Sequence, residues 1–118
     1  MKIIPRPVHA VMDYAYGAAA LAAPKVLGFQ DDDKARLAGT AVGVVTLVSA
    51  LTTRHEGGVV KLLPFNTHLK LDALTSLVAL ASPWLLGFSG NAKARNAMIG
   101  FAVIATTVVA LSQPDEEA

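Results

Sequence analysis

Two histidine–aspartate pairs are the residues of this chain whose types and spacing could do chemistry. His9 and Asp13 form one pair, and His68 and Asp72 form the other. The spacing within each pair is i, i+4, which places both side chains on one face of a helix. Ionisable groups inside a membrane helix are costly, so they raise a functional hypothesis by default. Two such pairs facing each other could bind a cation, relay a proton, or present His9 and His68 as axial ligands to a haem.

A structural role is the simpler interpretation of the same pairs. Each pair lies about one turn from the expected start of its helix. There Asp13 and Asp72 would cap backbone groups or meet the positive end of the helix dipole, and the histidines would hold them in place. Metal sites usually need three or four protein ligands, and aspartates also serve to orient histidine ligands. From the sequence we therefore assign no catalytic residue, no metal and no cofactor, and we leave the ionic and haem alternatives open.

The two pairs belong to an internal duplication. Residues 68–111 repeat residues 9–52 at a constant offset of 59, with fourteen identities and no gap. The most regular part of the repeat surrounds a proline and a Gly-Phe pair. Its motif residues are Pro24, Gly28 and Phe29 in the first copy, and Ser82, Pro83, Trp84, Gly87 and Phe88 in the second. The repeat predicts two copies of one structural unit.

The composition and the distribution of charge indicate a membrane protein. Of 118 residues, 53% are hydrophobic and only 16% are charged, against about 25% charged in soluble chains. Three long stretches, 37–53, 73–92 and 96–113, contain no charge, and each approaches the roughly 17–25 residues of a membrane span. The alternative is a soluble four-helix bundle, in which each helix would keep a polar face. Residues 37–53 have no charged face, so we favour the membrane.

These observations predict an all-α fold, a four-transmembrane-helix bundle made of two tandem parallel helical-hairpin repeats. We expect a single membrane domain, 1–118, divided into unit one at 7–53, a linker at 54–66, unit two at 67–112 and an acidic tail at 113–118. The helices should run over about 7–27, 34–53, 67–86 and 92–112. Pro24 and Pro83 should kink their helices without ending them, because helices that stopped there would be too short for a bilayer core of about 30 Å. A break at each proline is the alternative.

Turn and capping residues predict where the helices begin and end. Asp32 and its repeat partner Asn91 should cap the second and fourth helices, and Asn66 or Thr67 should cap the third. Gly28 and Gly87 should end the first and third helices. This arrangement puts both termini and the linker on one side of the membrane. Lysine and arginine are balanced between the two sides, so the orientation stays open.

Four cations near the starts of the second and fourth helices oppose the helix dipole. They are Lys34, Arg36, Lys93 and Arg95. Lipid phosphate is one expected partner for them, and a solvated charge pair is the alternative. Besides the lipid bilayer, we expect a second copy of the chain or another membrane protein as a partner. The net charge of +1 gives no reason to expect nucleic acid.

The segment Ala81-Ser82-Pro83-Trp84-Leu85-Leu86-Gly87-Phe88 resembles the signature of the SPW-repeat family, small integral membrane proteins of bacteria and archaea. In that family the Ser-Pro-Trp triplet marks a repeat of two membrane helices. The first copy departs from it, with Ala23-Pro24-Lys25. The resemblance implies the fold and a place in the prokaryotic inner (cell) membrane, and it brings no activity.

We therefore expect a small integral membrane protein that is not an enzyme, serving as a structural or interaction subunit. Two alternatives stay open. One is an ion- or proton-handling membrane protein that uses the paired histidines and aspartates. The other is a haem- or quinone-binding redox subunit.

Overall fold

The structure is a computed structural model that describes residues 2–114, so most of the predicted acidic tail lies outside the described residues. Over that range the chain forms four α-helices and no β-strand, which confirms the all-α prediction. The helices are α1 (Arg6–Val26), α2 (Asp33–Thr52), α3 (Phe65–Leu85) and α4 (Ala92–Leu111). The bounds of α3 and α4 lie 59 residues after those of α1 and α2, which is the offset of the sequence repeat.

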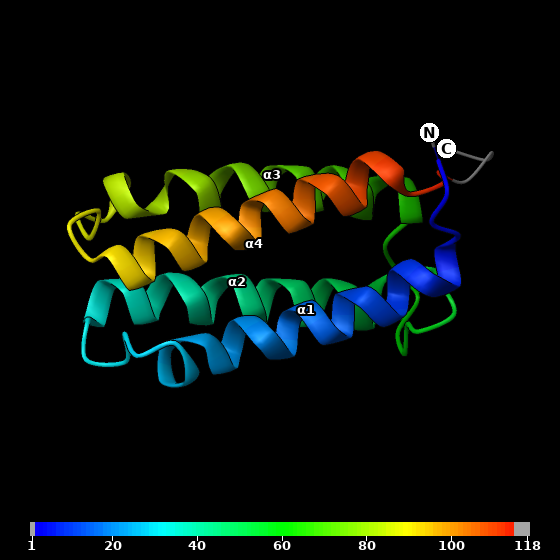
Figure 1. The fold of residues 1–118 in the computed structure, drawn as a ribbon. Helices are drawn as coiled ribbons and strands as arrows, with labels where there is room; N and C mark the ends of the chain where they lie inside the picture. The colour runs from blue at the N-terminus through cyan, green and yellow to red at the C-terminus, as the bar shows by residue number, and fades with distance from the viewer. Residues whose placement is uncertain (1, 115–118) are drawn as a thin grey trace.

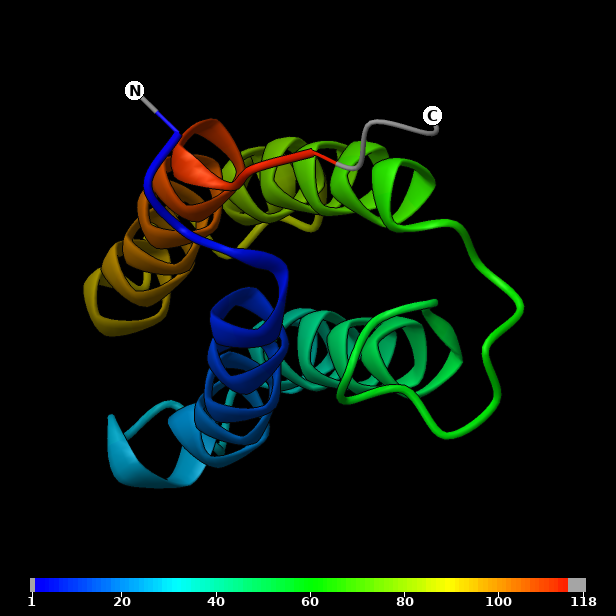
Figure 2. The same cartoon turned by 90° about the vertical axis from the view of Figure 1, so that its right-hand side faces the viewer.

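The helices pair as two hairpins that lie side by side (Figure 1). Packing is dense within the hairpins α1–α2 and α3–α4 and sparser between them. Seen from the end, α1 and α3 occupy opposite corners of the bundle (Figure 2). The first and last described residues and the linker 53–64 lie at one end, and the two short hairpin loops lie at the other (Figure 1). The hairpins thus run parallel to each other.

Both prolines lie inside helices, as the length argument predicts. Pro24 lies in α1 and Pro83 in α3. Each helix ends shortly afterwards at a glycine with positive φ, 82° at Gly28 and 80° at Gly87, a conformation that glycine adopts without the usual steric cost. The next residue then donates its N–H back to the proline carbonyl, at 2.9 Å for Phe29 and 2.8 Å for Phe88. This is a Schellman ending, and both phenylalanines are buried.

The predicted caps are correct for two helices and wrong for a third. Asp32 accepts from the backbone N–H of the third residue of α2, and Asn91 does the same for α4. Asn66 and Thr67 do not cap α3, because that helix already begins at Phe65 after Pro64. Pro64 matches Pro5, which precedes α1 in the same way. A proline at each entry fixes φ and limits how the chain can join the helix.

Small residues let the helices within a hairpin approach closely. The buried core is rich in alanine, with Met98, Phe29 and Phe88 as its large members. In the α1–α2 contact, a Cβ added at Gly43 would lie 3.0 Å from the carbonyl oxygen of Gly17. Glycine therefore sets the separation of these two helices. Gly39, one turn earlier in α2, also faces α1, where an added Cβ would lie 3.3 Å from the Pro24 side chain.

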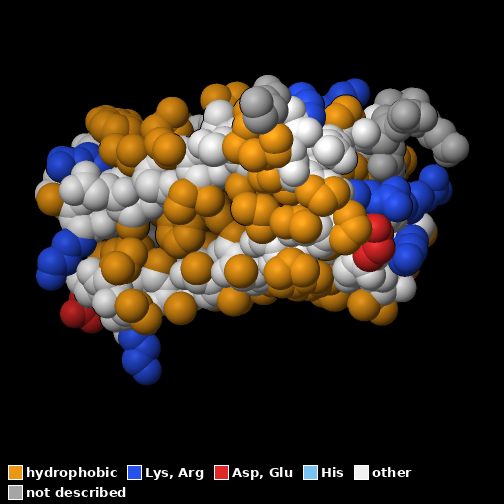
Figure 3. All heavy atoms as spheres, turned by 45° about the vertical axis from the view of Figure 1, so that its right-hand side comes forward, with side chains coloured by type: hydrophobic (Ala, Val, Ile, Leu, Met, Phe, Trp, Pro, Cys, Tyr) orange, Lys and Arg blue, Asp and Glu red, His pale blue; other side chains and the backbone are white. Residues whose placement is uncertain are grey.

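Large apolar side chains cover much of the outer surface. Exposed examples occur on all four helices, including Trp84 at 58% and Leu85 at 73%. In the view of Figure 3, hydrophobic side chains cover the middle of the bundle and lysine and arginine gather toward its two ends. Among the described residues, α2 and α4 are long and apolar enough to cross a membrane, by length and composition.

Candidate functional site

Extended segments at one end of the bundle form hydrogen bonds with the last residues of α2 and α4, beside the site. Ahead of α1, the N–H groups of Ile3 and Ile4 both donate to the Leu111 carbonyl at 2.8 Å. Ahead of α3, Leu62 and Leu63 donate to the Thr52 carbonyl at 3.0 and 2.8 Å. The two sets are related by the 59-residue offset. They hold the last residues of α2 and α4 against the first turns of α3 and α1.

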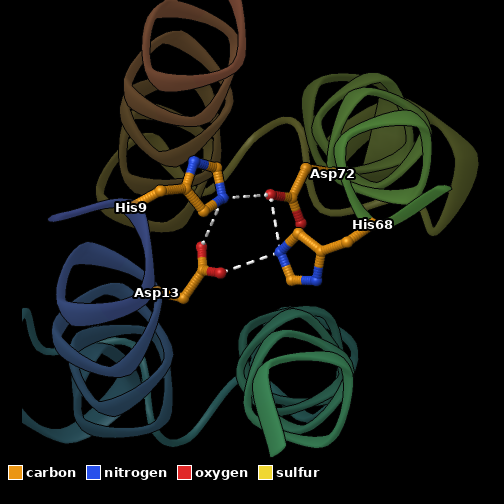
Figure 4. Close-up of side chains that lie close together, drawn as sticks. All are labelled: His9, Asp13, His68 and Asp72. Atoms are coloured by element: carbon orange, nitrogen blue, oxygen red, sulfur yellow. Dashed lines mark hydrogen bonds and ion pairs between the residues drawn. The ribbon is translucent and has the colours of Figure 1, made fainter. Parts of the chain in front are cut away.

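The His9, Asp13, His68 and Asp72 side chains converge between α1 and α3 to form the His/Asp ring (Figure 4). Within the pairs, His9 Nε2 lies 3.2 Å from Asp13 Oδ1, and His68 Nε2 lies 3.0 Å from Asp72 Oδ2. Between the pairs, His9 Nε2 lies 3.0 Å from Asp72 Oδ2, and His68 Nε2 lies 2.8 Å from Asp13 Oδ2. Each imidazole therefore faces both carboxylates, and the ring joins the two hairpins.

The ring is shielded from solvent. Both histidine side chains are fully buried, and the Asp13 and Asp72 side chains are 8% and 15% exposed. Despite their closeness, His68 Nε2 and Asp13 Oδ2 each lack a hydrogen-bond partner of acceptable geometry. Figure 4 shows the His68 nitrogen directed at the space between the two carboxylates. A buried polar atom without a partner is costly, and a proton, a water molecule or a cation bound to these two atoms would remove that cost.

Two hydroxyl groups fix which nitrogen of each histidine carries a proton. Ser112 Oγ lies 2.7 Å from His9 Nδ1 and donates to the Val108 carbonyl at 2.6 Å. Thr53 Oγ1 lies 2.6 Å from His68 Nδ1 and donates to the Ser49 carbonyl. A carbonyl can only accept, and a hydroxyl has one proton to give. Each hydroxyl must therefore accept from the histidine, so Nδ1 is the protonated nitrogen in both rings.

The electrostatics of the ring follow from this assignment. A neutral histidine protonated at Nδ1 has a bare lone pair at Nε2. Both Nε2 atoms face carboxylate oxygens, which are themselves acceptors, and His9 Nε2 has hydrogen-bond geometry toward Asp72 Oδ2 whereas His68 Nε2 has none. Bare acceptors at such distances repel each other unless positive charge lies between them. Two protons on the Nε2 atoms or one divalent cation would supply it, and either would balance the two carboxylate charges in a buried site.

His55 is a third buried histidine beside the ring, and sequence reasoning missed it. It lies in the linker, with Nε2 4.0 Å from Asp13 Oδ2, and neither of its ring nitrogens has a hydrogen-bond partner. Its ring contacts those of Phe65 and His68. Burial lowers the pKa of His55, which favours its neutral form. The chain has only three histidines, and all three lie close together. The small number of histidines could have indicated that His55 belongs to the same site.

A cavity of about 270 Å³ borders the ring on the α1/α4 side of the bundle. Asp13 and Asp72 form part of its wall, and most of its other lining is apolar. Tyr16 also lines it and donates its hydroxyl proton to the Phe101 carbonyl at 3.0 Å. Both carboxylates thus border a cavity whose wall is otherwise mostly apolar.

The geometry does not suit a haem held by His9 and His68. The two imidazole centroids are 5.3 Å apart, and the rings are nearly perpendicular. The Nε2 atoms that would bind iron lie within 3.2 Å of carboxylate oxygens. A macrocycle has no space between these groups.

The other predicted site residues lie away from the ring. Arg36 donates to the Gln30 carbonyl at 2.8 Å and pairs with Asp33 at 2.9 Å, and Arg95 donates to the Ser89 carbonyl at 3.2 Å. Both arginines thus bind their own hairpin loops, at repeat-related positions. Lys93 lies beside Gly28. Lys34 and Lys93 stay candidates for lipid headgroups.

The hydrogen bonds of the repeat-motif residues lie within their own helices and loops, and none of the contacts described above joins these residues to the His/Asp ring. Ser82 is buried and donates to the Ala79 carbonyl at 2.7 Å, whereas Trp84 is exposed. The hydroxyl groups of Thr53 and Ser112 escaped the sequence comparison because the two residues are similar but not identical. Extending the 59-residue match to chemically similar residues would have found them.

No protein-family model matches the chain, and no curated protein or solved structure is detectably similar to it.

Proposed function

We propose that the chain is an integral membrane protein in which all four helices cross the bilayer as two duplicated hairpins. The length and composition of α2 and α4 support this. Helices α1 and α3 have 21 residues each and pack beside them, and 21 residues span about 30 Å. The apolar surface of Figure 3 supports it as well. The resemblance to the SPW-repeat family and a location in the prokaryotic cell membrane belong to the same proposal.

Within that frame, the function we propose is ion handling: the His/Asp ring binds and exchanges positive charge, as protons or as a metal cation. The observation that carries the proposal is the pair of Nε2 atoms directed at carboxylate oxygens while Nδ1 is committed to a hydroxyl. Such an arrangement stays in place only with positive charge at its centre. The bordering cavity supports exchange, because Asp13 and Asp72 form part of its wall.

A purely structural subunit is the competing proposal. The ring joins α1 to α3, and packing between the hairpins is otherwise sparse, so the ring contributes to assembly in either case. Ion handling is favoured because two hydroxyl groups orient the histidines, a refinement that a simple joint between helices does not need.

Flux in proteoliposomes tests the proposal. The wild-type chain should dissipate an imposed gradient of protons or divalent cations faster than empty liposomes, as read by trapped indicators. Asp72→Asn should fold, by circular dichroism and gel filtration, and should lose the flux. Asp33→Asn is the matched control, because Asp33 is exposed at the start of α2, and it should behave as wild type. Wild-type liposomes no faster than empty ones would overturn ion handling in favour of the structural subunit.

A further inference from the structure

The side chains of the His/Asp ring have the number and chemistry of a four-ligand metal site. Each of the four residues offers one ligand atom, and these atoms lie within 4.8 Å of one another. Four ligands arranged tetrahedrally at the usual distance of about 2.0–2.2 Å from a zinc-sized ion lie about 3.3–3.6 Å apart. The observed histidine–aspartate separations are 2.8, 3.0, 3.0 and 3.2 Å; Asp72 uses Oδ2 for both of its contacts, whereas Asp13 uses Oδ2 toward His68 and Oδ1 toward His9. A small outward movement of the ligands, with rotation of the Asp13 carboxylate so that one of its oxygens faces both histidines, would admit the ion.

We infer that the ring is a binding site for one first-row divalent transition-metal cation of the Zn²⁺ class, held by His9, Asp13, His68 and Asp72. This inference rests on the proposed ion-handling function and names the ion. The direction of His68 Nε2 supports it independently. That atom is fully buried and hydrogen-bonds with neither nearby carboxylate. A proton there would lack a well-placed acceptor, whereas a lone pair directed between the carboxylates would bind a central ion.

The hydroxyl groups that hydrogen-bond to His9 and His68 are of the kind that support histidine ligands in metal sites. A metal-binding imidazole usually donates its other N–H to an oxygen, which fixes its tautomer and orientation. His9 donates to Ser112 and His68 donates to Thr53, at 2.7 and 2.6 Å. Both hydroxyl groups are fully buried and fixed by a second bond to a helix carbonyl. The two hydroxyl groups lie at repeat-related positions, so each copy of the repeat ends in a residue that supports the histidine of the other copy in the same way.

Charge and ligand type select the ion. Two neutral imidazoles and two carboxylates carry a charge of −2, so a divalent cation makes the buried site neutral, whereas a monovalent ion leaves it negative. Mixed imidazole and carboxylate ligands suit first-row transition metals. Calcium and magnesium prefer six or more oxygen ligands, which the ring does not offer.

Equilibrium binding of Co²⁺ tests the inference, with the full chain purified in mild detergent and treated with a chelator. We expect one Co²⁺ per chain, the intense visible absorption of a tetrahedral site, displacement by Zn²⁺, and no competition from Mg²⁺. Asp72→Asn should abolish this spectrum, and Asp33→Asn should retain it. Absence of Co²⁺ binding, a weak octahedral spectrum, or equal binding by Asp72→Asn would overturn the inference.

A milder pair of variants keeps the test decisive if Asp72→Asn does not fold. Thr53→Val removes the hydroxyl that orients His68 and should weaken Co²⁺ binding about 10–100-fold. Thr52→Val is the matched control, because the Thr52 hydroxyl donates to the Val48 carbonyl and contacts no histidine; it should bind as wild type. Equal affinity of the two variants would count against the site.

The two proposals fail in different ways. Proton flux that depends on Asp72, in a chain that binds no Co²⁺, would overturn the metal site and leave ion handling standing. Stoichiometric Co²⁺ binding without any flux would support the metal site and overturn exchange across the membrane.

Discussion

Removing the hydroxyl group of Thr53 should destabilise the bundle far more than removing the hydroxyl group of the neighbouring Thr52. Thr53 and His68 are both fully buried, and Thr53 Oγ1 lies 2.6 Å from His68 Nδ1. Thr53→Val keeps the side-chain shape but leaves the Nδ1 proton without an acceptor. A buried donor left unsatisfied costs about 1–3 kcal/mol, so the free energy of unfolding should fall by about that much. Thr52→Val removes an exposed hydroxyl and should cost less than about 0.5 kcal/mol.

Reversible unfolding of the purified chain in mixed micelles would measure both changes, with helical circular dichroism as the signal. The double variant Thr53→Val with His68→Phe should lose less unfolding free energy than the two single variants together. The phenyl ring that replaces the imidazole has no N–H group that could be left without an acceptor. Coupling of contacting residues is typically about 0.5–3 kcal/mol. Equal stability of Thr53→Val and Thr52→Val would refute the hydrogen bond between Thr53 and His68.

Three further predictions concern the two ends of the bundle. Gly28→Ala should cost about 1 kcal/mol or more in unfolding free energy, since φ is 82° there, whereas Gly90→Ala, which meets open space, should be nearly neutral. Asn91→Ala removes the α4 cap and should cost about 0.5–2 kcal/mol. The Asn91 amide also donates to Asp32 Oδ2 at 3.0 Å, and this hydrogen bond is the main cause that lowers the pKa of Asp32, so carboxyl NMR of the variant should show that pKa rising. Burial lowers the pKa of His55 in the folded chain, so below about pH 6.5 the unfolded chain binds a proton at His55 more readily than the folded chain does. The free energy of unfolding should therefore fall as the pH is lowered from 7.5 to 5.0, and it should fall more for wild type than for His55→Gln.

Much of the fold could be predicted because each feature has a local cause. The 59-residue repeat predicts equal hairpins, and the bounds of α3 and α4 follow those of α1 and α2 at that offset. Gly28 and Gly87 mark helix ends because the positive φ there favours glycine. The start of α3 was misplaced because Asn66 and Thr67 are good capping residues, whereas Pro64 sets the helix start without any side-chain cap.

The site could be predicted only in part. The i, i+4 spacing places each histidine beside its own aspartate, and this much is local. The contacts of His9 with Asp72 and of His68 with Asp13 depend on how two hairpins pack, which no spacing within one helix encodes. The same holds for Ser112, which reaches His9 across 103 residues of sequence.

The protonation states of His9 and His68 test the central claim most directly, and nitrogen-15 NMR of the histidine-labelled chain would report them. With bound Zn²⁺, both rings should show a protonated Nδ1 and a metal-bound Nε2. In the metal-free chain both nitrogens of each ring should be protonated, because the two carboxylates then need two protons between them. Neutral rings protonated only at Nε2, with or without metal, would contradict the account, since the hydroxyl groups of Thr53 and Ser112 would then not accept from the histidines.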